Sequence, residues 1–164
     1  MTFSLMTVCT GNICRSPMAE VVLRDALERA GLADVVSVRS TAVTIEEIGN
    51  PIDRRAQRVL ADAGYAVPRR RAVRVQRSDV EATDLALAMT AQHARALRAL
   101  GFPAAKVALF RAFEDGVPGG DPSDQDAPDT PDPWYGGPED FQECLATIEA
   151  CAPGIVDYVR ERVV

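Results

Sequence analysis

Cys9 and Arg15 lie close together near the start of the chain, in the segment VCTGNICRSP that runs from Val8 to Pro17. A cysteine thiolate is a strong nucleophile, and the planar guanidinium of an arginine can bind two phosphate oxygens at once. The spacing C-x5-R alone is a weak signal, because four cysteines in an arginine-rich chain can produce it by chance. The elements on either side therefore decide whether the pair can act on a phosphate.

The residues around Cys9 predict a loop between a strand and a helix. The apolar run Ser4–Cys9 favours a buried strand. Apolar residues at helical spacing predict a helix over Pro17–Ala30, with Ser16 as its N-cap and Pro17 as its first helical residue. A loop in this position directs backbone N–H groups and the positive end of a helix dipole toward a bound anion.

Other residues of the loop also fit the close approach of an anion. Gly11 lets the backbone come near a phosphate, and Asn12 tolerates the left-handed conformation that an anion-binding turn needs. The same field favours the thiolate form of Cys9, and the hydroxyl of Ser16 can donate a hydrogen bond to it. We therefore predict a dianion held above Cys9 by Arg15, with no need for a metal ion or a histidine base.

The rest of the chain alternates short apolar runs with helical patterns, which is typical of an α/β domain with a parallel sheet. Further strands are predicted over Val35–Ser40, Leu85–Met89 and Lys106–Phe110. Further helices are predicted over Asp53–Ala63, Ala91–Leu100 and Glu139–Arg162, the last with an interruption near Pro153. We expect four parallel strands, about five helices on both faces of the sheet, and the phosphate-binding loop between the first strand and the first helix.

Length and composition limit the class of protein. A chain of 164 residues with 47% hydrophobic residues fits one domain over residues 1–164. The net charge of −6 argues against general binding to nucleic acid or to an anionic membrane. We see no signal peptide and no membrane-spanning run, and so expect a cytoplasmic protein whose four cysteines are reduced. With a single histidine, we expect neither a metal site nor a cofactor.

Two segments have a biased composition. Glu114–Pro138 is a long loop rich in glycine, proline and aspartate, and loops of this length in compact domains are either functional or disordered. Arg69–Arg77, RRRAVRVQR, is basic, and its simplest interpretation is a solvated loop. The spacing of the long loop's acidic residues fits no calcium site, so we expect solvated side chains at Asp121, Asp124, Asp126 and Asp129.

The segment VCTGNICRSPMAE resembles the active-site signature of the low-molecular-weight protein tyrosine phosphatases. The segment DPWYGG, which begins at Asp132, is similar to the aspartate loop of that family, and GNPIDRRA is similar to the start of one of its helices. The chain length also matches, so the resemblance covers nearly the whole chain. It implies a phosphomonoester hydrolase, most specifically a metal-independent protein tyrosine phosphatase.

The resemblance implies a role for each residue of the site. Cys9 attacks the phosphate and forms a phosphocysteine, Arg15 stabilises the transition state, and Asp132 acts as general acid and then as general base. Trp134 and Tyr135 flank an aromatic leaving group and thereby favour phosphotyrosine. The expected partner is a phosphotyrosine protein or a small aryl phosphate, and the expected state is a monomer or weak dimer. The remaining phosphate-binding positions are Thr10, Gly11, Asn12, Ile13, Cys14 and Ser16.

The loop and the last helix contain further informative positions. Protein-arginine phosphatases typically have threonine where this chain has Ile13, so the isoleucine indicates the tyrosine-directed branch. The resemblance implies that Cys14 can form a reversible disulfide with Cys9 under oxidation. Cys144 and Cys151 are predicted to be core residues of the last helix.

The chain departs from the family pattern in four places. The second strand continues as STAVT (Ser40–Thr44) instead of Ser-Ala-Gly-Thr, and EEIG (Glu46–Gly49) replaces a Trp-His-Val-Gly segment that walls the pocket. Arg70 stands where the family has a histidine, and the family's Met-Asp pair after the third strand is Met89–Thr90. These changes spare the nucleophile, the arginine and the acid.

The departures lead to three expectations about the pocket. Glu46 or Glu47 should lie near its rim, and Arg69–Arg71 should lie nearby. His93 does not replace the missing histidine and is predicted to be a surface or capping residue. An altered pocket would give a selective substrate preference or slow turnover.

Two other functions remain open from the residues. Thioredoxin-coupled arsenate reductases share the C-x5-R loop but need two more cysteines to relay a disulfide, and Cys144 and Cys151 would have to serve. A phosphate-binding regulatory module would keep the loop without efficient turnover.

Overall fold

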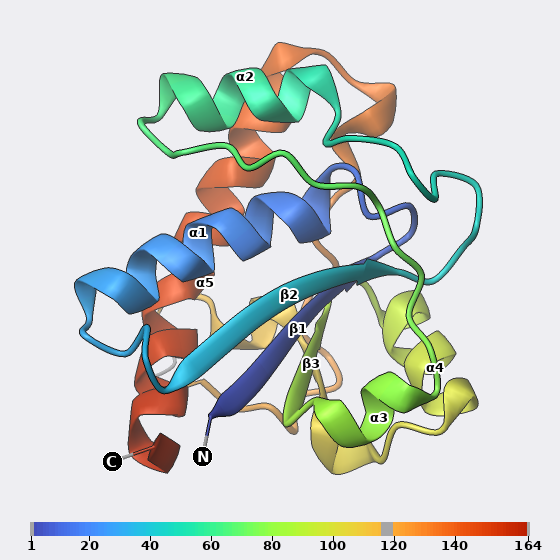
Figure 1. Ribbon diagram of the computed structural model, residues 1–164, viewed down its shortest axis with the longest axis vertical. Helices are drawn as coiled ribbons and strands as arrows, with labels where there is room; N and C mark the ends of the chain where they lie inside the picture. Colours follow the sequence, from blue (N-terminus) through green and yellow to red (C-terminus); the bar gives the residue numbers. More distant parts are fainter. Residues whose placement is uncertain (1, 116–119, 164) are drawn as a thin grey trace.

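A four-stranded parallel sheet forms the centre of the molecule (Figure 1). The structure, a computed structural model, describes residues 2–115 and 120–163. The strands are β1 (Phe3–Cys9), β2 (Val36–Ala42), β3 (Leu85–Ala88) and β4 (Val107–Leu109). The α-helices are α1 (Arg15–Arg29), α2 (Arg54–Asp62), α3 (Ser78–Ala82), α4 (Ala91–Leu100) and α5 (Pro138–Val163). Short 3-10 helices cover Ala104–Lys106, Phe110–Phe113 and Pro133–Tyr135.

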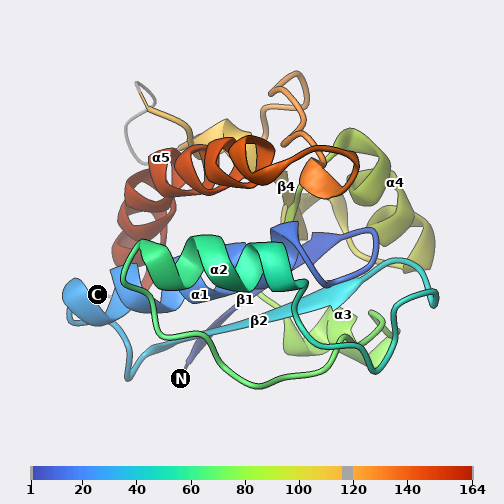
Figure 2. The same ribbon diagram turned by 90° about the horizontal axis from the view of Figure 1, so that it is seen from above.

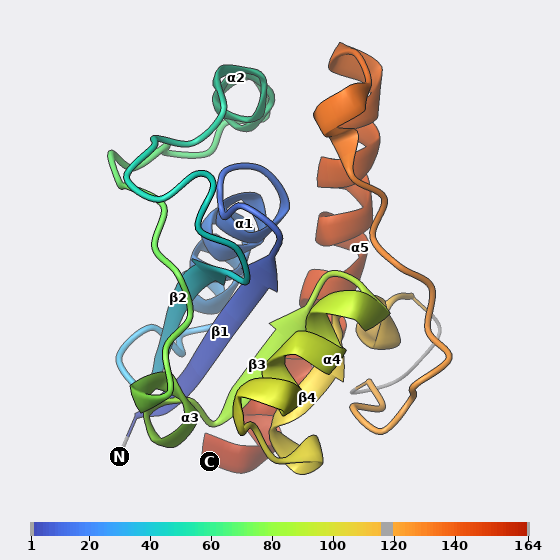
Figure 3. The same ribbon diagram turned by 90° about the vertical axis from the view of Figure 1, so that its right-hand side faces the viewer.

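The order of the strands determines where a ligand can bind. The order is β2-β1-β3-β4, so the chain crosses the sheet in opposite directions after β1 and after β3. Because parallel crossovers are right-handed, α1 and α4 lie on opposite faces of the sheet. Helix α5 packs against α1, and α4 packs on β3 and β4 (Figures 2 and 3). The carboxyl ends of β1 and β3 meet where the direction reverses, the usual ligand site of such a sheet.

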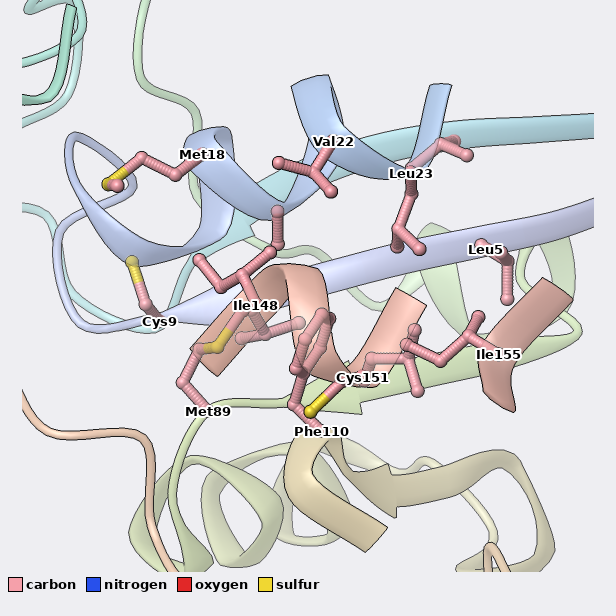
Figure 4. Packing of buried hydrophobic residues seen from close by; sticks show 14 of the residues in the cluster. Leu5, Cys9, Met18, Val22, Leu23, Met89, Phe110, Ile148, Cys151 and Ile155 are labelled. Atoms are coloured by element: carbon pink, nitrogen blue, oxygen red, sulfur yellow. The ribbon is translucent and has the colours of Figure 1, made fainter. Parts of the chain in front are cut away.

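The packing of α1 and α5 joins the two ends of the chain. Val22 and Leu23 of α1 face Ile148 and Ile155 of α5, and all four side chains are almost fully buried (Figure 4). Gly154 allows α5 to approach the 3-10 helix Phe110–Phe113 closely, because a Cβ there would lie 2.5 Å from the backbone oxygen of Phe113. This packing fixes the C-terminal part of the chain against the element that follows the phosphate-binding loop.

The predicted α/β fold is confirmed, and every predicted strand and helix is present with ends that agree within a residue or two. Helix α4 has the predicted bounds because both of its ends are encoded locally. The Thr90 hydroxyl accepts the backbone N–H of His93, and Gly101 follows the helix with a φ of 122°.

Two predicted details of the helices are wrong. Helix α1 begins at Arg15 with Cys14 as its N-cap, so Ser16 lies inside the first turn and does not cap the helix. The predicted interruption near Pro153 is absent from α5: proline removes one backbone donor, and the packing of α5 holds the helix continuous.

Helix α3 had no sequence signal, because five residues are too few to show a helical period. In the described part of the chain, no helix has both the length and the apolar character needed to cross a membrane. Residues 116–119 of the predicted long loop lie outside the described residues.

Candidate active site

The loop between β1 and α1 places the thiol of Cys9 beneath a turn of backbone. Asn12 adopts the predicted left-handed conformation, with a φ of 60°. Its backbone N–H donates to Cys9 Sγ at 3.3 Å, and Ser16 Oγ lies 3.0 Å from the same sulfur. The thiol is only 3% exposed, yet it lines a cavity at the carboxyl end of β1. Because α1 begins at Arg15, Ser16 lies in its first turn, where its hydroxyl contacts the sulfur of Cys9.

A chain of hydrogen bonds holds this turn from behind. The Asn12 side-chain amide donates to Ser16 Oγ at 2.8 Å. Arg70 donates to both Asn12 oxygens, at 2.7 Å to the backbone oxygen, and to Ser40 Oγ at 3.0 Å. Ser40 in turn donates to the buried carboxylate of Glu20 at 2.7 Å. Burial lowers the pKa of Arg70, while Glu20 and Cys9 act in the opposite direction.

Arg70 therefore occupies the place where the family pattern has a histidine, and it joins the loop to β2. Its three acceptors belong to Asn12 and Ser40, which are far apart in the chain. A guanidinium has enough donors in a fixed fork to bind all of them at once. The changed residue thus still holds the loop.

Arg15 links the loop to the long acidic segment. Its side chain is 5% exposed and donates to the backbone oxygen of Thr130 at 2.9 Å. Its other terminal nitrogen lies 3.5 Å from Thr10 Oγ1 and 3.5 Å from Asp132 Oδ2. One guanidinium thereby spans the distance between the two predicted halves of the site.

The segment Asp132–Gly137, which we call the acid loop, is held at its outer side by α2. Arg55 donates to the backbone oxygen of Trp134 at 3.0 Å, and its guanidinium lies over the rings of Trp134 (5.2 Å) and Phe141 (4.6 Å). Asp53 caps α2, pairs with Arg55 at 3.1 Å, and donates its own backbone N–H to the backbone oxygen of Ile13. The Asp132 carboxylate accepts a hydrogen bond from the backbone N–H of Trp134 and so caps the start of the 3-10 helix Pro133–Tyr135. Helix α2 thus contacts both the phosphate loop and the acid loop.

The prediction that His93 is only a surface or capping residue is wrong. Its side chain is buried, with 2% of the residue exposed, and its Nε2 lies 2.8 Å from Thr10 Oγ1. Burial and then the charge of Arg15 lower the pKa of His93 to about 4, so the ring is neutral near pH 7. The position of His93 in the sequence could have indicated this contact with the loop. His93 lies in the first turn of the helix that follows β3, and this turn lies near the carboxyl end of the neighbouring strand β1.

The cavity above Cys9 measures about 220 Å³ and brings the predicted residues together. Asn12 and Ser16 are fully buried beneath it and do not line it. The prediction for Glu46 and Glu47 is confirmed, since both lie in the wall. Its lining is Cys9, Thr10, Gly11, Ile13, Cys14, Arg15, Glu46, Glu47, Asp132, Trp134 and Tyr135.

Arg69–Arg71 lie near the pocket, as expected, but none of the three lines it. Arg70 reaches the loop from behind, while all three arginines line a separate cavity with Pro51, Ile52 and Pro68. The chain leaves β2 at Ala42 and returns along its outer edge near Arg74, which turns this basic segment away from the mouth.

The remaining cysteines differ from Cys9 in their surroundings. Cys14 is buried but lines the same cavity, and burial raises its pKa. Cys144 and Cys151 are core residues of α5, as predicted, and burial raises the pKa of each to about 12. Among residues 2–115 and 120–163, histidine, cysteine and acidic side chains form no group that could hold a metal ion.

These features define what the cavity can do. A sulfur nucleophile lies at its floor, a guanidinium lies beside it, and a carboxylate lies at its mouth. The set suits the attack of sulfur on an anionic electrophile, followed by protonation of a leaving group.

The chain is similar in sequence and fold to known proteins. Residues 4–164 match the family described as low molecular weight phosphotyrosine protein phosphatase. A low molecular weight protein-tyrosine-phosphatase of Streptomyces coelicolor is 44% identical over 99% of this chain and 97% of its own. The crystal structure of a low molecular weight phosphotyrosine phosphatase from Vibrio cholerae superposes with a TM-score of 0.83 at 31% identity, covering 99% of both chains.

A structure of the arginine phosphatase YwlE, a Bacillus subtilis protein, is also similar, with a TM-score of 0.83 at 26% identity over 99% of this chain and 100% of its own. The match of sequence and fold over nearly the whole length leads to one conclusion. The chain belongs to the low molecular weight phosphotyrosine protein phosphatase family.

Proposed function

We propose that this protein hydrolyses phosphotyrosine monoesters through a phosphocysteine formed on Cys9. The observation that carries the proposal is the position of Asp132, which lies 3.5 Å from Arg15 and lines the same cavity as Cys9. A nucleophile and a proton donor at one anion site are what an in-line displacement at phosphorus requires.

In the first step, the Cys9 thiolate attacks phosphorus and the bond from phosphorus to the phenolic oxygen breaks. Asp132 gives its proton to that oxygen, so the tyrosine leaves as a neutral phenol. Arg15 and the backbone N–H groups of the loop stabilise the charge on the equatorial oxygens.

In the second step, water attacks the phosphocysteine while the Asp132 carboxylate takes its proton. The sulfur–phosphorus bond breaks, inorganic phosphate is released and the thiolate returns. Ser16 Oγ lies 3.0 Å from Cys9 Sγ, and the backbone N–H of Asn12 lies 3.3 Å from it. Hydrogen bonds from these two groups stabilise the thiolate both as nucleophile and as leaving group. Every group in both steps comes from the chain itself, so the scheme needs neither a metal ion nor a cofactor.

The lining of the cavity favours an aryl phosphate. Trp134 and Tyr135 stand at the mouth, 40% and 91% exposed, where they can flank a phenol ring. Ile13 lines the same cavity and offers an apolar surface, which suits a phenol better than a phosphoguanidinium. These contacts support phosphotyrosine over phosphoarginine as the substrate.

The proposal is tested with p-nitrophenyl phosphate in the presence of a chelator. We expect activity without added metal, a loss of about 10⁴-fold or more in Cys9→Ser, and losses of about 10²- to 10³-fold in Arg15→Ala and Asp132→Asn. Asp126→Asn, in the same acidic loop, is the matched control and should keep wild-type activity. Full activity in Cys9→Ser, or loss of activity with chelator, would overturn the mechanism, and binding without turnover would indicate a regulatory module.

The burial of the other cysteines bears on the arsenate reductase alternative. Cys144 and Cys151 lie in the core of α5, where thiols of high pKa are poor relays for a disulfide. Cys14 lines the cavity beside Cys9, so a disulfide between these two residues stays a prediction. Mass spectrometry after peroxide treatment tests it. A cytoplasmic location, where both thiols are reduced unless an oxidant is present, is part of the same proposal.

A further inference from the structure

Exposed apolar side chains gather around the catalytic cavity. In the described part of the chain, the large apolar residues with high exposure are Val35, Ile45, Ile48, Val73, Trp134 and Tyr135. Trp134 and Tyr135 line the catalytic cavity itself. Ile45 and Ile48, 64% and 50% exposed, flank Glu46 and Glu47 of its wall. Such clustering on one side of a protein marks an interaction surface.

The two isoleucines line a second hollow, which we call the apolar groove. It measures about 730 Å³ and lies between Ile45 and Ile48 on one side and α4 on the other. Its lining is Val43, Ile45, Ile48, Arg74, Val75, Gln76, Ala96, Ala99 and Leu100, so it is mainly apolar with one arginine and one glutamine. Figures 1 and 2 show the loop after β2 and helix α4 at the same end of the molecule. The small side chains of Ala96 and Ala99 leave the groove open along α4.

The loop that carries the isoleucines is a shared wall between the groove and the catalytic cavity. Thr44 donates its N–H to the backbone oxygen of Thr10 at 3.1 Å, and Gly49 donates to that of Ala72 at 2.9 Å. The backbone N–H of Ile48 donates to the backbone oxygen of Ile45 at 3.3 Å and closes a turn. The loop is therefore fixed at both ends, with the glutamates in the cavity wall and the isoleucines in the groove.

We propose that the apolar groove seats an apolar side chain of the substrate protein, close in sequence to the phosphotyrosine held above Cys9. The inference rests on the proposed phosphatase function and names its substrate class: a polypeptide with an aliphatic or aromatic residue beside the phosphotyrosine. The occupant is the substrate because the groove and the cavity share one wall, so a chain leaving the cavity crosses Glu46 and Glu47 to reach the isoleucines.

The same wall restricts the residues next to the phosphotyrosine. Glu46 and Glu47 face whatever chain crosses between the two hollows, and carboxylates repel acidic neighbours. Phosphotyrosine sites flanked by an apolar residue and lacking acidic neighbours should therefore be hydrolysed best. Small aryl phosphates reach only the catalytic cavity.

The experiment compares two phosphotyrosine peptides that differ only in having leucine or serine at the flanking positions. On the wild-type protein, kcat/KM should be about five- to tenfold higher for the leucine peptide, through KM. In the double variant Ile45→Ser, Ile48→Ser this ratio should fall toward one. Val35→Ser changes an exposed apolar residue just before β2; it is the matched control and should keep the ratio. Circular dichroism checks that each variant is folded.

Several outcomes would overturn the inference. Equal kcat/KM for the two peptides on the wild-type protein would show that the groove is not used. A ratio that survives the double substitution would show that the preference arises elsewhere. A dimer that is lost in the double variant would assign the groove to a second copy of the chain. Turnover of p-nitrophenyl phosphate by the wild type tests the proposed function separately, because this compound carries no flanking residue.

Discussion

His93 Nε2 lies 2.8 Å from the hydroxyl of Thr10, so helix α4 is hydrogen-bonded to the phosphate loop. Thr10 follows β1 and His93 follows β3, and these two strands are neighbours where the sheet reverses direction. The Thr10 hydroxyl also lies 3.5 Å from the guanidinium of Arg15. Through this one hydroxyl, His93 supports the cation that lines the anion site.

Replacing His93 should weaken phosphate binding. His93→Phe keeps an aromatic ring but removes the bond to Thr10, so we expect kcat/KM to fall about tenfold and the inhibition constant of inorganic phosphate to rise. His93→Gln retains a hydrogen-bonding side chain and should recover part of the loss. An unchanged phosphate inhibition constant in His93→Phe would mean that the ring only fills space.

His93 also predicts how stability depends on pH. Its pKa is lowered from 6.5 to about 4, so between these values the unfolded chain binds a proton that the folded chain does not. The free energy of unfolding should therefore decrease as the pH falls through this interval, by roughly 3 kcal/mol from this group. Urea unfolding at pH 7 and pH 4.5 should show a smaller decrease for His93→Gln than for the wild type. Equal decreases would contradict the assignment.

Arg70 should control the shape of the loop. Arg70→Gln loses most of the donors that bind Asn12 and Ser40, and the left-handed Asn12 is then less well held. We expect kcat to fall about ten- to a hundredfold, with partial recovery in Arg70→Lys. Arg69→Gln removes a neighbouring exposed arginine and should have little effect. Steady-state kinetics of the three variants distinguish a specific loss from a general effect of charge.

Arg55 should act through the general acid. Arg55→Ala frees the acid loop from α2, because the bond to the Trp134 oxygen and the contacts with two rings are lost. We expect a loss of about tenfold for p-nitrophenyl phosphate and a larger loss for phenyl phosphate, whose leaving group depends more on protonation. Arg54→Ala, one residue earlier and exposed, is the control. Equal losses for both substrates would place the effect outside proton transfer.

The four cysteines should differ in reactivity. Iodoacetamide should alkylate Cys9 first, because its sulfur faces the cavity and is held by two donors. Burial raises the pKa of Cys14, Cys144 and Cys151, so these thiols should react slowly. Peptide mapping by mass spectrometry measures the order, and inorganic phosphate should protect Cys9. Early modification of Cys151 would show that α5 opens.

Local signals explain which features were predictable. The loop from Cys9 to Arg15 and the bounds of α4 follow from residues adjacent in the chain, such as the Thr90 cap and Gly101. The place of Ser16 was missed because the first turn of α1 begins earlier than its proline indicates.

Contacts between distant segments explain the rest. The roles of Arg70 and His93 depend on partners 58 and 83 residues away, which no local pattern encodes. The apolar groove forms where α4 contacts the loop after β2. The sequence contains the two isoleucines of this loop but does not show that the two segments lie side by side.

The packing of α5 on α1 has a consequence for the newly synthesised chain. Cys9 and the phosphate loop leave the ribosome early, whereas Asp132 and the helix that fixes its loop come near the end. The proposed nucleophile is therefore made before the proposed proton donor. On the mechanism we propose, a chain that has not yet been synthesised as far as Asp132 has no group to protonate the leaving oxygen, so it cannot complete turnover on other proteins while it is being made.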